Sequence, residues 1–236
     1  MEVTKPLRVN QIAPSEARQW LLLRHYARRS CPVSFAFGAY RDAELIGVVT
    51  YGTPVSSPLR SGVCGPDWAP YVLELNRLCC ESSRNVASKL VGASLRLLPR
   101  PRVVVSYADT AQGHVGYVYQ ATNFLYTGLS AIRTDWKVRG KESLHGATIA
   151  DESRGRQNRA EWMRQKYGDD FYLSIRPRKH RYVYVCGNAR QRSQIRSSLR
   201  YPIEPYPKGD SQRYNADAPL STQFAFFTGE GARPAP

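Results

Sequence analysis

The chain has 236 residues, a length that suits one domain with a sizeable appendage. Its 34 lysines and arginines outnumber its 19 aspartates and glutamates by 15, and this excess favours an anionic polymer, above all nucleic acid, as partner. The 42% hydrophobic content excludes wholesale disorder, and no apolar stretch is long enough for a membrane span. We expect no secretory signal in residues 1–10, because they contain no apolar h-region. The five cysteines are odd in number and form no CxxC pattern, so we expect reduced thiols in a cytoplasm-like compartment.

The N-terminal part of the chain predicts a helix followed by a hairpin. Ser15 is a suitable N-cap for a segment with helical periodicity that we expect to run to about Arg29. Residues 33–40 and 45–51 are apolar on one side or throughout, and a polar turn between them predicts an antiparallel hairpin. Residues 52–70 are rich in glycine, proline and serine and predict an ordered loop over a site or a surface.

The middle of the chain alternates strands with helices. Residues 71–79 predict a strand with one apolar face, and residues 86–98 carry apolar side chains at helical spacing. Residues 102–107 form the continuous apolar run of a buried strand, and a short helix over 114–121 and a strand over 124–131 follow. The fold class that we predict is therefore mixed α/β (α+β), with a largely antiparallel sheet flanked by helices.

Positive charge concentrates late in the chain. Residues 151–200 contain 13 lysines and arginines and five acidic residues, a net of 13 − 5 = +8, with aromatic residues interleaved. Such a segment is either a solvated surface or a contact for nucleic acid, and the excess over the whole chain favours nucleic acid. We therefore predict a core over residues 1–150, a basic extension over 151–200 that completes the core and contacts DNA, and an irregular proline-rich tail over 201–236. The predicted contacts are Arg154, Arg156, Arg159, Arg176, Arg178, Lys179 and Arg181.

The loop over residues 81–85 opens the predicted helix that begins at residue 86. Free backbone N–H groups at a helix N-terminus attract anions, and pyrophosphate is a natural guest. An ordinary capped helix is the alternative, and neither a Walker motif nor a GxGxxG motif is present. The candidate cofactor-binding residues are Leu78, Ser83, Arg84, Asn85, Val86 and Ser88.

Candidate catalytic residues follow the buried strand and the first helix. Asp109 lies beyond the strand, where it can act as a general base or orient one, and Tyr119 can protonate a leaving group. His25 and Tyr26 lie near the end of the first helix. The alternatives are ordinary packing for the tyrosines and a structural role for the histidine.

With these segments laid out, the chain resembles the GNAT-type acyltransferases. FAFGAYRDAELIGVVTYG resembles their central hairpin, and LELNRLC resembles the strand that splays from its neighbour to admit pantetheine. ESSRNVASKLVGASLRLL stands in the place of the pyrophosphate loop and its helix, with Ser83, Asn85 and Ser88 where small glycines are usual. YVYQATNF resembles the family's Y-x-x-x-G-F ending, with Asn123 in the glycine place and Tyr119 in that of the general acid. The resemblance implies an acyl-CoA-type donor.

More specifically, five segments together are similar to the Mom family of DNA-modification proteins of Mu-like phages. They occur in order and read HYARRSCP, YGTPVSSPLR, ELNRLC, NVASKLVGASLR and SYADTAQGHVGYVYQATNFLYTG. The resemblance as a whole covers most of residues 15–185. This resemblance implies a phage enzyme, in the cytoplasm of the infected bacterium, that acts on double-stranded DNA. The family converts the exocyclic amine of adenine to an N-carbamoylmethyl (acetamido) derivative, which protects phage DNA from host restriction. His25, Tyr26, Asp109 and Tyr119 match the family's polar positions suspected in catalysis.

That product sets requirements for the chemistry. The target base must be flipped out of the stack, at a cost of a few kcal/mol. The base nitrogen is bonded to a methylene carbon, which simple transfer from acetyl-CoA cannot yield. Either another donor is used or further chemistry follows, with or without a metal ion. Two other functions compete with this one: a conventional N-acetyltransferase of a small amine or a protein, and a non-catalytic DNA-binding protein.

Overall fold

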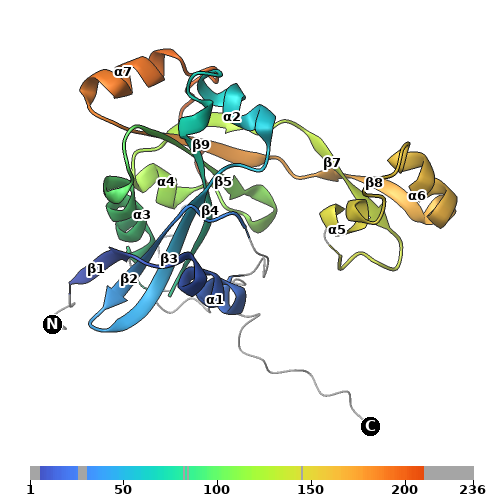
Figure 1. Cartoon of the computed structure of the whole chain (residues 1–236), viewed down its shortest axis with the longest axis horizontal. Helices are drawn as coiled ribbons and strands as arrows, with labels where there is room; N and C mark the ends of the chain where they lie inside the picture. The colour runs from blue at the N-terminus through green and yellow to red at the C-terminus, as the bar shows by residue number, and fades with distance from the viewer. Residues whose placement is uncertain (1–5, 26–30, 82, 84, 145, 210–236) are drawn as a thin grey trace, which may run out of the picture. The chain divides into compact units, whose positions relative to one another are not determined.

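The computed structural model describes residues 6–25, 31–81, 83, 85–144 and 146–209 (Figure 1). The chain divides into two compact units, the first formed by residues 1–108, 114–128 and 180–236, and the second by residues 109–113 and 129–179. This division does not follow the predicted boundary after residue 150. Charge composition, on which that boundary was based, does not report where the chain leaves the main sheet and returns to it.

The first unit is built on a seven-stranded sheet in the order β1-β2-β3-β4-β5-β9-β6. Strands β1 to β4 pair antiparallel in succession, and β4 and β5 pair parallel. The predicted fold class, mixed α/β with a largely antiparallel sheet, is thereby confirmed. The strands are β1 (Leu7–Gln11), β2 (Phe35–Arg41), β3 (Glu44–Gly52), β4 (Val72–Cys80), β5 (Arg102–Asp109), β6 (Leu125–Leu129) and β9 (Lys179–Cys186).

Helices cover both faces of this sheet. Their bounds are α1 (Pro14–Arg24), α2 (Ser57–Cys64), α3 (Val86–Leu97), α4 (Tyr117–Ala121) and α7 (Ala189–Ser197), with a 3-10 turn η1 (Ala69–Tyr71). Side chains alternate along the strands, so that Phe37 and Val104 pack toward α3 and α4, whereas Val48 packs toward α1 and Val103 toward α2 and α7. The larger core, with the buried rings of Tyr51 and Tyr182, lies between the sheet and α3.

The structure differs from the sequence prediction at α2 and at β1. Residues 57–64 were expected to be loop, but Ser56 caps a helix there by accepting a hydrogen bond from the Leu59 N–H, and Pro58 lies in its first turn. Serine and proline are common in loops, but they are also common at the N-cap and in the first turn of helices. The serine and proline content of this segment therefore did not distinguish a helix from a loop. Strand β1 was not predicted. It is a short, mostly polar edge strand that pairs with β2 from Leu7↔Arg41 to Gln11↔Phe37.

The second unit contains a two-stranded antiparallel sheet and two short helices. Strand β7 (Arg133–Val138) pairs with β8 (Phe171–Arg176), and α5 (Gly146–Asp151) and α6 (Arg159–Tyr167) pack on it. Two 3-10 turns, η2 (Thr110–Gln112) and η3 (Gly168–Asp170), complete the unit. Its small core consists of Val138, Ile149 and Met163, with Trp136 and Phe171 at its edge.

Residues 201–209 contain no helix or strand, but they are tied to the first unit. The backbone N–H of Glu204 donates to the carbonyl of Tyr126, and the Tyr206 hydroxyl donates to the carbonyl of Phe124. Within the part of the chain that the structure describes, no helix combines the length and the apolar character needed to cross a membrane.

Candidate functional site

Strands β4 and β5 pair only over their first residues and then part. The ladder comprises three pairs, from Val72↔Val103 to Glu74↔Val105, although β4 continues to Cys80 and β5 to Asp109. A further link is the hydrogen bond that Ser106 Oγ donates to the carbonyl of Leu75, at 3.1 Å. The carboxyl-terminal halves of two central strands thus carry backbone groups outside the β4–β5 ladder, which is the separation that the GNAT resemblance implies.

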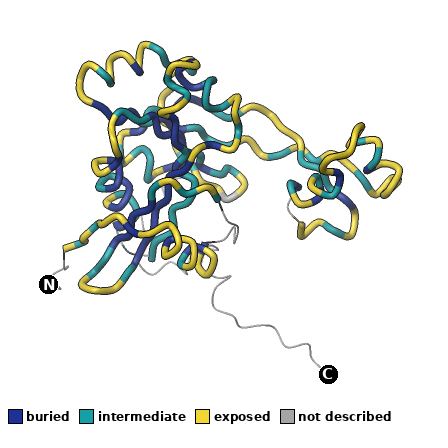
Figure 2. Tube along the Cα trace, viewed as in Figure 1, coloured by how far each residue is buried: buried dark blue, intermediate teal, exposed yellow. Residues whose placement is uncertain are grey.

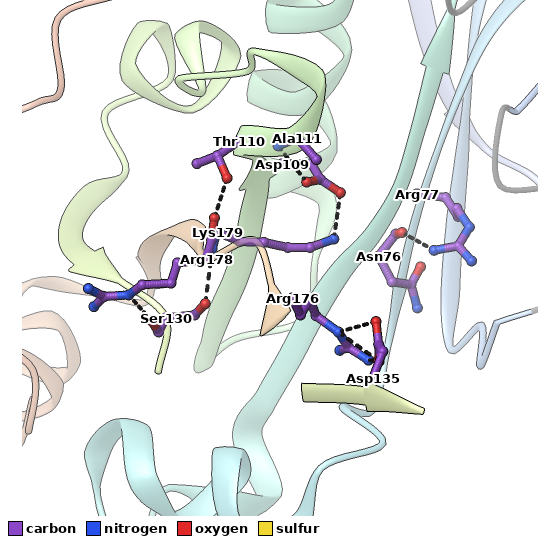
Figure 3. A network of polar contacts seen from close by, with 10 residues as sticks. All are labelled: Asn76, Arg77, Asp109, Thr110, Ala111, Ser130, Asp135, Arg176, Arg178 and Lys179. Atoms are coloured by element: carbon purple, nitrogen blue, oxygen red, sulfur yellow. Dashed lines mark hydrogen bonds and ion pairs between the residues drawn. The ribbon is translucent and has the colours of Figure 1, made fainter. Parts of the chain in front are cut away.

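A β-bulge lies where the two strands part. Thr50 pairs with Arg77 and Tyr51 pairs with Leu75, so Asn76 is the extra residue on β4. Its side chain accepts a hydrogen bond from Thr50 Oγ1 (2.7 Å) and donates one to the carbonyl of Pro32 (2.7 Å). The Arg77 guanidinium donates to the Asn76 carbonyl, as Figure 3 shows. Bulges concentrate next to active sites because they re-aim side chains, and sequence reasoning missed this one because nothing in LELNRLC marks it.

The N-terminus of α3 has the properties of an anion site. Asn85 precedes the helix in the left-handed conformation (φ 64°), and its side chain makes no capping hydrogen bond. The first turn of α3 contains no acidic residue, so nothing there opposes an anion. Arg41, at the end of β2, donates from Nη2 to the Ser83 hydroxyl at 3.1 Å and thus brings a cation to the loop. Arg41 was not among the predicted residues, because it precedes Ser83 by 42 positions in the sequence.

The other predicted cofactor-binding residues lie along the same β4–α3 connection. Leu78 packs partly buried against the main core, and the Val86 side chain is fully inside that core, which leaves only its backbone for a ligand. Ser88 donates its hydroxyl to the Asn85 carbonyl at 3.2 Å. Arg84 falls outside the described residues, and its role stays a prediction.

His25 follows the last turn of α1 and is 7% exposed. Burial, together with the positive charge of Arg77, lowers the pKa of His25 to about 4. The imidazole is therefore neutral at neutral pH, and its low pKa makes it a weaker base than an exposed histidine. Tyr26, predicted beside it, lies outside the described residues.

Asp109 ends β5 and forms a close ion pair. Its Oδ2 lies 2.7 Å from the Lys179 ammonium, and its Oδ1 accepts the backbone N–H of Ala111 at 3.1 Å (Figure 3). A predicted catalytic residue and a predicted DNA contact are therefore partners of each other. Both belong to the second unit, whereas His25 and Tyr119 belong to the first.

Tyr119 lies on α4 within an aromatic cluster. Its ring centroid is 5.3 Å from that of Phe124 and 5.1 Å from that of Tyr182. Asn123, which ends this segment, has a φ of 60°, and asparagine tolerates that left-handed conformation better than most residues. This explains how asparagine can stand where the resemblance leads one to expect glycine.

Most of the predicted DNA contacts are engaged within the protein. In the second unit, Arg176 forms a bidentate pair with Asp135, and Arg178 donates to the carbonyl of Ser130 (Figure 3). In the first unit, Arg181 donates to the hydroxyl and the carbonyl of Thr127. The remaining predicted contacts lie in the second unit: Arg159 bonds to Ser153 and Ala150, Arg156 lies over the Trp162 ring, and Arg154 pairs with Asp151.

No group of three or more histidine, cysteine, aspartate or glutamate side chains that could hold a metal ion occurs among the described residues.

A model of the Mom protein family matches residues 6–208. The methylcarbamoylase mom of Escherichia phage Mu is 30% identical in an alignment of 213 residues that covers 87% of this chain and 85% of that protein. Among solved structures, an N-acetyltransferase from Staphylococcus aureus Mu50 matches with a TM-score of 0.41 and 12% identity, over 77% of this chain and 99% of its own. The ribosomal-protein-S18-alanine N-acetyltransferase from Escherichia coli matches with a TM-score of 0.41 and 5% identity, over 78% and 96%.

Proposed function

The chain belongs to the Mom protein family, and we propose that it is a phage DNA-modification transferase that converts the exocyclic amine of adenine to its N-carbamoylmethyl derivative. The observation that carries this proposal is the extent of the family match. It spans residues 6–208 and so includes both compact units and all four candidate catalytic residues. The name of the phage Mu relative, a methylcarbamoylase, agrees with this chemistry.

The donor site that we propose is the start of α3 with the separated ends of β4 and β5. The backbone N–H groups at the start of α3 and the Arg41 guanidinium are suited to a phosphate-bearing donor, because both present positive charge and hydrogen-bond donors. An acyl-CoA-type molecule bound here would supply an activated carbon chain. The halves of β4 and β5 that do not pair with each other offer backbone groups that can hold such a chain between them.

The reaction requires that the adenine nitrogen lose a proton while it forms a bond to the methylene carbon of the acetamide group. The bond between that carbon and a leaving group must break in exchange. A thioester carries its leaving group on the carbonyl carbon, so the step needs either a donor with a leaving group on the methylene carbon or further chemistry on the bound acyl group. The amine is a weak nucleophile, because its lone pair is delocalised into the ring. A positioned proton acceptor therefore contributes directly to the rate.

His25 and Asp109 are the two proton acceptors that we propose. The His25 imidazole is kept neutral by its burial, and the Asp109 carboxylate is fixed by Lys179 and by the Ala111 N–H. Tyr119 is the proposed donor of a proton to the leaving group, and its ring is oriented by Phe124 and Tyr182.

Protection of DNA against restriction nucleases tests this function. The adenine amine lies in the major groove, where nucleases read it, so a carbamoylmethyl group on it should block cleavage. Plasmid purified free of protein from cells that express the chain should resist nucleases whose sites contain adenine. It should remain sensitive to a nuclease whose site contains only G·C pairs, which is the control.

The same assay separates the competing functions. Plasmid from cells that express Asp109→Asn or Tyr119→Phe should be cleaved, and both variants should still fold and bind DNA nearly as the wild type does. Full sensitivity of the plasmid from wild-type cells would contradict the proposal. That result would favour a conventional acetyltransferase or a DNA-binding protein without catalysis.

A further inference from the structure

We propose that α7 contacts the DNA backbone, and that its arginines, rather than the basic residues of 154–181, provide most of the salt-dependent affinity. This inference rests on the proposed function, because it assumes a DNA substrate. It names the surface of the first unit that holds that substrate.

Charge is distributed unevenly along the basic segment, residues 151–200. All five acidic residues of 151–200 lie at or before Asp170, and the next acidic residue after it is Glu204. Between these two acids the chain carries eight cations and no carboxylate. The excess that suggested nucleic acid therefore lies entirely downstream of the second unit's helices.

The structure divides these eight cations into two groups of four. The first group makes ion pairs or hydrogen bonds with residues outside the segment, so its charge or its donors are already used; it comprises Arg176, Arg178, Lys179 and Arg181. The second group lies on or beside α7 and forms no ion pair with any described residue; it comprises Arg190, Arg192, Arg196 and Arg200. Arg178 and Arg181 donate only to neutral oxygens and keep their charge, and Arg192 donates to the Gly187 carbonyl. Even so, four of the six cations of this stretch that form no ion pair among the described residues lie on or beside this one helix.

Helix α7 presents this charge to solvent. Ile195 is fully buried against α2 and the sheet, and it fixes the orientation of the helix. At about 100° per residue, Arg190 and Arg196 stand about 120° apart on the opposite side, with Ser193 and Ser197 on the arc between them. All four are exposed, and the tube along α7 is largely yellow in Figure 2.

This face is suited to phosphates. Two arginines with two hydroxyls between them can contact successive phosphates of one strand, since guanidinium and hydroxyl groups are common phosphate ligands. The helix is held firmly at its start, where Asn188 and Gln191 form a capping box. A rigid, uncompensated basic helix is a surface for the DNA backbone, and it carries no base-specific information by itself.

The salt dependence of binding to duplex DNA tests the proposal on the full chain. We compare the wild type with Arg190→Gln/Arg196→Gln. The matched control is Arg154→Gln/Arg164→Gln, which removes the same charge from two exposed arginines that already have acidic partners. Each lost phosphate contact should reduce the slope of log Kd against log salt by about 0.9, so the α7 variant should lose about 1.8. The control should keep a slope close to that of the wild type.

A charge-retaining variant guards against misfolding. Arg190→Lys/Arg196→Lys should bind with nearly the wild-type slope, because lysine also contacts phosphates as a point charge. An unchanged slope in the α7 glutamine variant, an equal loss in the control, or a lysine variant as weak as the glutamine variant would overturn the assignment to α7. If the wild type itself shows no salt-dependent affinity for duplex DNA, the proposed function fails instead.

Discussion

Single residues of the candidate site are held by partners that lie far from them along the chain, as Asp109 is by Lys179. Asp109 and Lys179 were predicted to act in different processes, one in catalysis and one in DNA contact, yet they form one ion pair across 70 residues of chain. Composition and spacing describe what a side chain can do. They do not describe what it meets, since pairs of this kind depend on the path of the chain.

The environment of His25 has a measurable consequence for stability. Burial and Arg77 lower its pKa in the folded protein to about 4, whereas the unfolded chain has a pKa near its ordinary value of 6.5. The stability that this histidine contributes is therefore complete above pH 6.5 and is lost as the pH falls toward 4. The loss should amount to about 3 kcal/mol at most, because each unit of pKa difference corresponds to about 1.4 kcal/mol.

Urea unfolding of the wild type and of His25→Gln between pH 7 and pH 4 measures this contribution. Carboxylates also titrate in this range, but they do so in both proteins, so the difference between the two curves isolates His25. The wild type should lose more stability than the variant as the pH falls. Parallel curves would contradict the low pKa.

At the scale of elements, periodicity located most of the sheet and the main helix of the core. The hairpin over β2 and β3, the strands β4 and β5, and α3 all lie within two residues of their predicted bounds. Helix α2 and strand β1 could not be predicted, because a proline- and serine-rich start resembles a loop and a polar edge strand has little apolar pattern. The bulge at Asn76 depends on the register against β3, which the sequence of β4 does not specify.

The hydrogen bond between Arg41 on β2 and Ser83 in the β4–α3 connection leads to a prediction for Arg41. Its guanidinium reaches Ser83 at the start of the proposed donor site, so Arg41→Gln should reduce modification of DNA strongly and leave DNA affinity unchanged. Arg8→Gln is the matched control. Arg8 lies opposite Tyr40 on the neighbouring strand, over its ring, and loses the same charge. The modified fraction of adenine in cellular DNA and the Kd for duplex DNA are the two readouts.

Two results would remove Arg41 from the donor site. An equal loss of modification in the Arg8 variant would reduce the effect to net charge. A parallel loss of DNA affinity in the Arg41 variant would place Arg41 on the DNA surface.

In the molecule as a whole, the charge excess from which we predicted a nucleic-acid partner is distributed differently from the predicted basic extension. The basic segment 151–200 crosses both compact units, and the acids within it balance much of the charge in the second unit. The division of the chain at residues 109–113 and 129–179 was not predicted, because it depends on where the chain leaves the main sheet and returns to it. The family match includes residues of both units.

Carbamoylmethylation of adenine by this chain can be tested directly by mass spectrometry of nucleosides from plasmid DNA of cells that express it. We expect part of the deoxyadenosine to gain the mass of a carbamoylmethyl group in place of one hydrogen. We also expect the modified nucleoside to be absent from cells that express Asp109→Asn or Tyr119→Phe at the same level. Deoxyadenosine of unchanged mass in the wild-type cells, or the same modified nucleoside in cells with either variant, would contradict these expectations.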